Sequence, residues 1–290
     1  MQTGKLSLLA FVLLIFVSAC KKTEVETITG NQAPDDHTIG NEVYENYITK
    51  TYILVLGREP DSAEFNASLD LLKTNSLSDS SRRAFLDDVF NDPGYRHRQF
   101  DKWNGELLNY MDTSEVSFFI YLFNLQLSDT TYQYAWPVLQ YEKDRLLQLQ
   151  PAGNLYVNGT ITLRELQSRM LNSYFYDQIN MGNLNFVVAS FRQLLNRYAT
   201  DQEKTAGVSM VSGSNAVLLL QAGTGKEDYL NIITHADDYF EGAIVRLYND
   251  FLFRDPESLE MSVAAIRYRD TGDYEQAQKD ILASNEFIGI

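Results

Sequence analysis

The amino-acid sequence predicts an all-α protein, with about four three-helix units packed as a helical repeat array or bundle. Two observations predict this class. Apolar residues recur at helical spacing through long stretches, with only six prolines in 290 residues to interrupt them, and a short pattern returns along the chain. In the first stretch, residues 41–58, Tyr44, Ile48, Tyr52 and Val55 fall on one face of a helix, and no alternating strand pattern lies nearby.

The N-terminus has the features of a secretory signal, and we expect residues 1–19 to be a signal peptide. Lys5 precedes the apolar run 6–17, which is short for a membrane span. The run ends in Val-Ser-Ala-Cys20, which resembles the lipobox of bacterial lipoproteins, so Cys20 is expected to be acylated, for instance with palmitate. The alternative is an ordinary signal peptide or signal anchor that happens to contain a cysteine. Because Cys20 is the only cysteine, one chain can form neither a disulfide nor a cysteine metal cluster.

Residues 20–41 have the composition of a flexible tether, with few large apolar residues and no periodicity. Lys21 follows the cysteine where an aspartate would resemble an inner-membrane retention signal, so we expect an outer membrane lipoprotein, on the periplasmic face or the cell surface. Removing residues 1–19 takes away one lysine and no acid, which changes the net charge from −15 to −16. This charge excludes nucleic acid as a partner and leaves the lipid as the contact with the membrane.

A four-position pattern occurs three times. Tyr52, Leu56, Arg58 and Glu64 correspond to Phe191, Leu195, Arg197 and Glu203, and again to Tyr248, Leu252, Arg254 and Glu260. A degenerate copy keeps Tyr121 and Leu125 but has Leu127 and Gln133 in place of the arginine and the glutamate. Each copy is followed by a segment that closes on an aromatic residue, namely Tyr95, Tyr176, Tyr239 and Phe287. The period of roughly 40 to 55 residues is typical of stacked helical arrays.

These patterns divide the chain into four helical units after the tether. The expected units are unit 1 (42–110), the degenerate unit 2 (111–182), unit 3 (183–242) and unit 4 (243–290). The closing aromatics are predicted to end the third helices and to be largely buried, because rings of this kind at helical spacing fill the space between helices.

Each arginine and glutamate pair is predicted to form the corner between the first two helices of its unit. In the last copy Asp255 offers an N-cap oxygen and Pro256 suits the first helical position, while Thr200 and Glu203 form a capping box in the third. The arginine is expected to bridge to the glutamate or to bind carbonyl groups at the end of the first helix, with an anion site as the alternative.

The third helices are expected to begin with similar capping devices. The pairs are Thr162 with Glu165, Thr224 with Glu227, and Asp273 with Gln276.

The motif Y-x-x-V-L-G-R-E-P, at residues 52–60, is followed by F-L-x-x-V-F-x-x-P-x-Y, at residues 85–95. Together they resemble the helical repeat of phycobilisome-linker-like domains and of a related domain of unknown function repeated in secreted bacterial proteins. The resemblance covers most of unit 1, is fainter around residues 191 and 248, and fails in unit 2. It implies a helical repeat fold and a role in assembly or at a surface, with no catalytic residues attached to the motif.

Signals for catalysis are poor. His37, His97 and His235 lie far apart in the sequence, and the acids next to His235 are more typical of helix caps than of a metal site. The stretch AGTGKED, residues 222–228, superficially resembles a phosphate loop but lacks the first glycine and the hydroxyl residue. We therefore expect no catalytic site, no metal and no cofactor, and the chain is predicted not to be an enzyme.

The function that these observations favour is a lipid-anchored, non-catalytic scaffold or protein-interaction module of the bacterial envelope, whose protein partner the sequence does not identify. The alternative is a carbohydrate-binding accessory lipoprotein at the surface. Aromatic residues make up 12% of the chain, and exposed rings stack on sugars, but most of them stand at helical spacing and are expected in the core.

Overall fold

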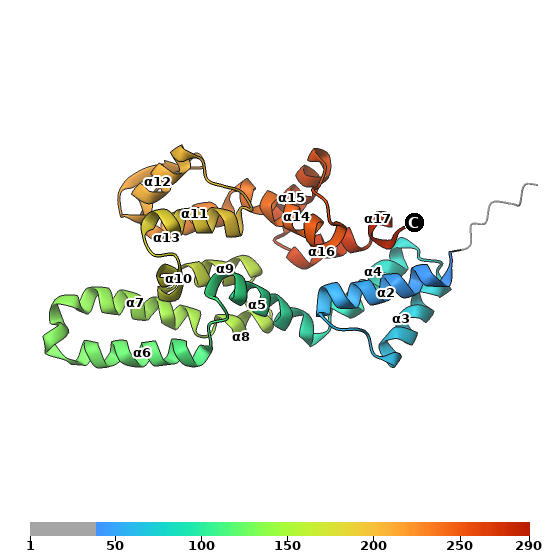
Figure 1. Cartoon of the computed structure of the whole chain (residues 1–290), viewed down its shortest axis with the longest axis horizontal. Helices are drawn as coiled ribbons and strands as arrows, with labels where there is room; N and C mark the ends of the chain where they lie inside the picture. The colour runs from blue at the N-terminus through green and yellow to red at the C-terminus, as the bar shows by residue number, and fades with distance from the viewer. Residues whose placement is uncertain (1–38) are drawn as a thin grey trace, which may run out of the picture. The chain divides into compact units, whose positions relative to one another are not determined.

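Helices make up most of residues 39–290, which is the part of the chain that the computed structural model describes (Figure 1). The predicted all-α class is confirmed. The predicted signal peptide, the expected lipidation site Cys20 and nearly all of the tether lie outside the described residues.

The elements follow one another in this order: α2 (Asn41–Leu56), α3 (Ser62–Thr74), α4 (Asp79–Phe90), α5 (Pro93–Leu108), α6 (Thr113–Ser128), the 3-10 helix η2 (Thr130–Ala135), α7 (Trp136–Leu149), α8 (Ala152–Val157), α9 (Leu163–Leu171), α10 (Tyr174–Ile179), α11 (Asn183–Leu194), α12 (Asp201–Val211), β1 (Asn215–Leu218), β2 (Gln221–Thr224), α13 (Gly225–His235), α14 (Asp237–Leu252), α15 (Ser258–Thr271), α16 (Tyr274–Leu282) and α17 (Asn285–Ile288). The two strands pair as an antiparallel hairpin, which the sequence analysis did not anticipate.

The first helix buries the face that its periodicity predicted. Tyr44, Ile48, Tyr52 and Val55 are all buried. The helix ends at Gly57, whose left-handed backbone (φ 73°) lets its N–H bond the carbonyl group of Ile53. A single apolar stripe and a glycine cap therefore set the length of α2.

In unit 4 the helix that follows the corner begins two positions later than predicted. Glu257, not Asp255, is the N-cap residue of α15, and Pro256 precedes it instead of taking the first helical position. Asp255 accepts a hydrogen bond from Asn249 at 2.9 Å. In unit 1 the N-cap is likewise the residue after a proline, Asp61, and in unit 3 the predicted capping box of Thr200 with Glu203 is present. The proline sets the approach to the helix while the next residue caps it.

The caps of the third helices agree with the prediction in two of three places. Thr162 accepts from the N–H of Glu165, and Asp273 accepts from that of Gln276. The predicted box of Thr224 with Glu227 is wrong, since Thr224 is already paired in strand β2 and makes no side-chain cap. Asp228 accepts the N–H of Thr224 instead, at 2.8 Å.

The closing aromatics do not end the third helices, as predicted, but stand in the first turn of the next helix. Each is three residues after an N-cap residue: Tyr95 in α5, Tyr176 in α10, Tyr239 in α14 and Phe287 in α17. Their predicted burial is confirmed, with exposed fractions between 0% and 3%. The expected boundary at residues 242 and 243 falls inside α14, which both closes unit 3 and opens unit 4.

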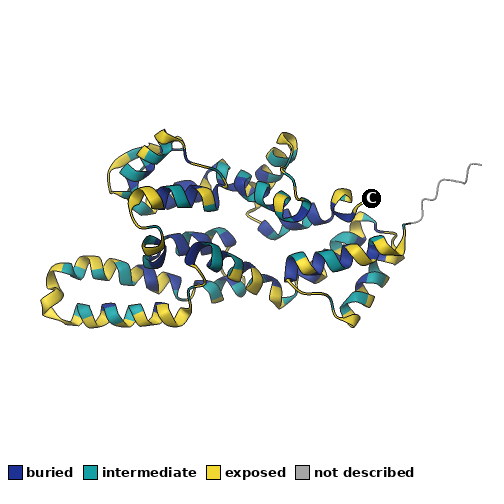
Figure 2. Ribbon diagram, in the orientation of Figure 1, coloured by how far each residue is buried: buried dark blue, intermediate teal, exposed yellow. Residues whose placement is uncertain are grey.

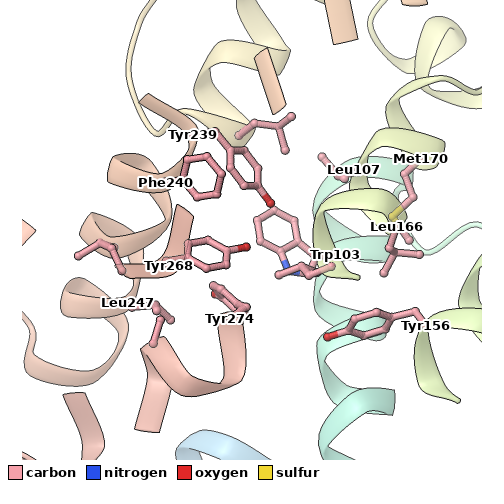
Figure 3. Packing of buried hydrophobic residues seen from close by; sticks show 14 of the residues in the cluster. Trp103, Leu107, Tyr156, Leu166, Met170, Tyr239, Phe240, Leu247, Tyr268 and Tyr274 are labelled. Carbon is pink, nitrogen blue, oxygen red and sulfur yellow. The ribbon is translucent and has the colours of Figure 1, made fainter. Parts of the chain in front are cut away.

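Part of the core lies where α5 and α14 face each other, as Figure 3 shows for Trp103 and Leu107 on one side and Tyr239, Phe240 and Leu247 on the other. The guanidinium of Arg246 on α14 lies 4.9 Å from the ring centroid of Trp103. These two helices therefore join the first half of the described chain to the second.

Two buried tyrosine–glutamine pairs link the halves in the same way. The hydroxyl of Tyr95 donates to Gln278 at 3.3 Å, and that of Tyr239 donates to Gln167 at 2.6 Å. Each glutamine stands nine residues before the closing aromatic of its own unit, so units 1 and 4 repeat the contact of units 3 and 2. Contacts of α16 with α4 and of α17 with α2 complete the link between the last unit and the first.

Candidate functional site

The structure brings each repeated arginine and glutamate together at the turn after the first helix. Arg58 donates two hydrogen bonds to Glu64 at 2.7 and 2.6 Å, Arg197 donates two to Glu203 at 2.9 and 2.6 Å, and Arg254 donates two to Glu260 at 2.8 and 2.9 Å. Each guanidinium also donates to the carbonyl oxygen of the residue after it, in Glu59, Tyr198 and Asp255. The fork of arginine matches this pair of acceptors, which a lysine could not reproduce.

A second carboxylate reaches every corner from the helix that follows the third one. Asp92 bonds Arg58, Asp238 bonds Arg197, and Glu286 bonds Arg254, each at 2.6 or 2.7 Å. The closing aromatics lie one to three residues beyond these acids in the sequence. The corner therefore holds the end of the first helix to the start of the second and to the helix that begins the next unit.

The remaining parts of the corner repeat as well. The residue six before each arginine is aromatic, and the ring centroids of Tyr52, Phe191 and Tyr248 lie 5.5, 5.0 and 5.1 Å from the guanidinium carbons. The residue just before each arginine has a positive φ: 73° at Gly57, 51° at Asn196 and 56° at Phe253. This left-handed residue turns the chain so that the arginine can reach back over the ring.

Electrostatics of the corners favour a structural role. Hydrogen bonds from the arginines lower the pKa of Glu203 and of Glu260 to about 2, and that of Glu64 in the same direction. Because protein acceptors engage each guanidinium through both of its terminal nitrogens, the arrangement is that of a helix corner and not of an anion site.

Unit 2 departs from this geometry. Leu127 and Gln133 make no corner, and α6, η2 and α7 form a helical hairpin in its place (Figure 1). Tyr121 and Leu125 are 57% and 49% exposed, although Tyr52 and Leu56 at the same repeat positions are buried. The hairpin thus has apolar residues at the positions that are buried in unit 1, but here these residues are exposed.

Much of this α6–α7 hairpin, which we call the arm (residues 113–149), is exposed (Figure 2). Large apolar side chains contribute to the exposed surface. The exposed ones are Phe118, Tyr121, Leu125, Tyr132, Tyr134, Val138, Tyr141 and Leu147. Between residues 116 and 141 the only charged side chain is Asp129. In proteins generally, a large exposed apolar patch with so little charge is typical of interaction sites. Its α6 strip is visible in the sequence as an apolar run, but the periodicity does not say which face stays uncovered.

At the base of the arm lies a partly buried group of charges that the sequence analysis missed. Arg145 donates to Glu142 at 2.8 Å and to Asp177 at 2.6 Å, and Asp177 also accepts from Lys226. Burial and the charge of Arg145 lower the pKa of Lys226 to about 8, and burial raises the pKa of Glu142. Lys226 belongs to the stretch that superficially resembled a phosphate loop, and here it binds α10 to α13.

The residues weighed for catalysis or metal binding do not converge. His235 donates through Nδ1 to the carbonyl oxygen of Asn231 at 2.8 Å, while Asp237 pairs with Arg269 and Asp238 with Arg197. Within residues 39–290, no three histidine, cysteine or acidic side chains are placed to hold a metal ion. Over the same residues, no helix combines the length and apolar character of a membrane span.

Comparison with protein-family models finds no match, and neither the curated proteins nor the solved structures give one.

Proposed function

We propose that this protein is a non-catalytic scaffold or protein-interaction module, held at the outer membrane of a bacterial cell through a lipid on Cys20. The observation that carries the proposal is the arm. It leaves apolar positions of the repeat exposed in unit 2, whereas units 1 and 3 bury the same positions. Covering such a surface with a partner is favourable, by about 25 cal/mol of free energy per Å² of apolar area removed from water.

The corners support the non-catalytic part of the proposal. Acidic pairs that could have served as acid and base are each held by an arginine, as Glu203 and Asp238 are by Arg197. Carboxylates that are held by an arginine in this way suit a rigid framework that presents a surface. The resemblance of unit 1 to phycobilisome-linker-like repeats also supports the proposal, because that resemblance implies a role in assembly or at a surface.

The interaction is tested by crosslinking in intact cells followed by purification of the protein. We expect a defined envelope protein to be captured by the wild-type chain and lost with the double variant Tyr121→Asp and Leu125→Asp. Tyr198→Asp is the matched control, since Tyr198 is 73% exposed and lies at the unit 3 corner, outside the arm. If the arm variant captures the same protein as the control does, the arm is not the interaction surface.

The proposed lipid anchor on Cys20 is tested separately with labelled palmitate. The wild-type chain should incorporate the label and sediment with membranes, while the Cys20→Ser chain should do neither. Label that persists in the Cys20→Ser chain would contradict the lipoprotein assignment.

Carbohydrate binding is the second candidate, and the exposed tyrosines of the arm favour it. Tyr132, Tyr134 and Tyr141 are 39%, 85% and 41% exposed, and phenol rings of this kind stack on sugar faces. Titration with envelope polysaccharide fragments should then change the tyrosine fluorescence of the wild-type chain and leave that of a Tyr134→Ser, Tyr141→Ser chain unchanged.

A further inference from the structure

The turn of the β1–β2 hairpin has an unfavourable backbone and an exposed leucine. Leu219 and Leu220 have φ of 47° and 63°, and two-residue turns of this form normally contain Asn-Gly because a Cβ is disfavoured there. Leu220 is 98% exposed and Val217 is 62% exposed, whereas Leu218 between them is buried. Residues 214–225 carry no charge. The hairpin therefore turns one face onto its own unit and presents Val217 and Leu220 outward.

A groove on unit 4 has the complementary character. It has a volume of about 390 Å³, and its lining includes the apolar side chains Leu252, Leu259, Val263, Tyr268 and Ile281 beside charged ones such as Glu260, Arg267 and Asp280. Leu259 and Val263 on α15 are 75% and 51% exposed.

The equivalent helices of the other units lack these side chains. Counted from the corner glutamates, the positions of Leu259 and Val263 are held by Ala63 and Ala67 in α3 and by Gln202 and Ala206 in α12. The apolar surface is therefore particular to unit 4.

Unit 3 shows what such a groove can hold, because its own hairpin lies on the corresponding surface. A Cβ built on Gly223 would lie within 3.2 Å of Met210, Asp228 and Ile232. The corresponding residues of unit 4, counted from the corner glutamate and the closing aromatic, are Arg267, Gln276 and Asp280, and all three line the groove. In unit 4 the connection between α15 and α16 is only two residues long, so no hairpin of its own covers this surface.

We propose that the groove between α15 and α16 binds the β1–β2 hairpin of a second copy of this chain, with Leu220 and Val217 entering it. The uncharged hairpin adds no like charge to a groove whose lining already includes Glu257, Glu260 and Asp273. Hairpin and groove are different surfaces, so the contact is head-to-tail and each copy can bind a neighbour at either side. This self-association uses surfaces distinct from the arm and stands independently of the proposed function.

The test is the molar mass of the full chain in solution, measured by light scattering over a series of concentrations. The Cys20→Ser background is used so that an anchor does not itself drive association. The wild-type surface should give a mass that rises with concentration. Leu220→Asp and Val263→Asp should each weaken association by roughly a hundredfold or more, because a carboxylate would replace an apolar contact.

Mixing the two variants separates a head-to-tail contact from any other. The Leu220→Asp chain keeps an intact groove and the Val263→Asp chain keeps an intact hairpin, so an equimolar mixture should form a one-to-one pair that does not grow further. Ala67→Asp, at the equivalent position of α3, should associate like the unmodified surface. A monomeric mass at every concentration, or a mixture that stays monomeric, would overturn the proposal.

A second variant guards against loss of folding as the cause. Replacing Leu219 and Leu220 with Asn-Gly removes the leucine and relaxes the turn. It should raise the melting temperature and abolish association together. Association that survives this replacement would also overturn the proposal.

Discussion

Replacing Arg197 with lysine tests the corner most directly, because it keeps the charge and removes the fork. In the structure Arg197 donates twice to Glu203, once to Asp238 and once to the carbonyl oxygen of Tyr198, and it stacks on Phe191. One ammonium group cannot reach all of these acceptors from one position. The perturbation therefore leaves one carboxylate or the carbonyl without its donor.

The magnitude follows from how sheltered the corner is. A fully exposed ion pair contributes ~0.2–1 kcal/mol, and a hydrogen bond to a charged group in a sheltered position about 1.5–3 kcal/mol. The side chain of Arg197 is 33% exposed, which lies between these cases. We expect Arg197→Lys to lower the free energy of unfolding by about 1–2 kcal/mol.

Urea unfolding followed by far-ultraviolet circular dichroism measures this loss. Arg269→Lys is the control, because Arg269 makes only exposed pairs with Asp237 and Asp270 and should change stability by less than about 0.5 kcal/mol. For a domain of this size, a loss of 1 kcal/mol corresponds to a shift of roughly 2–4 °C in melting temperature. Equal stabilities for the two lysine variants would refute the structural role of the corner.

Three further outcomes are expected. The stability lost in Glu203→Gln should be largest above the ordinary carboxyl pKa of 4.5 and should vanish as the pH falls to about 2, because the lowered pKa of Glu203 makes its stabilising effect depend on the ionised form. The measurement is the difference in unfolding free energy between the wild type and the variant across that range. A difference that is the same at every pH would contradict the prediction. Tyr239→Ala should lower the free energy of unfolding by about 3–5 kcal/mol as a core deletion, and Tyr239→Phe by about 1–3 kcal/mol because buried Gln167 loses its donor. If calorimetry finds no change in stability for Tyr239→Phe, the tyrosine–glutamine hydrogen bond does not stabilise the fold. Asn-Gly at Leu219 and Leu220 should raise the melting temperature by a few degrees, since a left-handed leucine costs ~1–2 kcal/mol, and a lowered value would mean that the leucine side chains stabilise the turn.

Local features of this protein could be predicted from the sequence because their causes are local. The periodicity of Tyr44, Ile48 and Tyr52 states which face of α2 is buried, and the capping box of Thr200 with Glu203 depends on residues three apart. The arginine and glutamate at each corner stand six residues apart, across one turn, so their recurrence at that spacing was sufficient to expect them together.

Other local predictions failed where two signals competed. Asp255 and Thr224 are both good caps, but Glu257 and the pairing of strand β2 took precedence. The apolar run before Thr224 reads equally well as part of a helix, and the leucines at its turn violate the usual hairpin chemistry, so the hairpin gave no clear signal.

Only the tertiary structure decided which surfaces stay open and which residues meet across units. Asp92, Asp238 and Glu286 join their corners from more than thirty residues away, and Gln167 and Gln278 find their tyrosines in other units. Tyr121 and Tyr52 hold the same repeat position, yet one is exposed and the other buried. Periodicity describes the apolar face of one helix, whereas burial depends on whether another helix arrives to cover it, and that is a property of the whole packing.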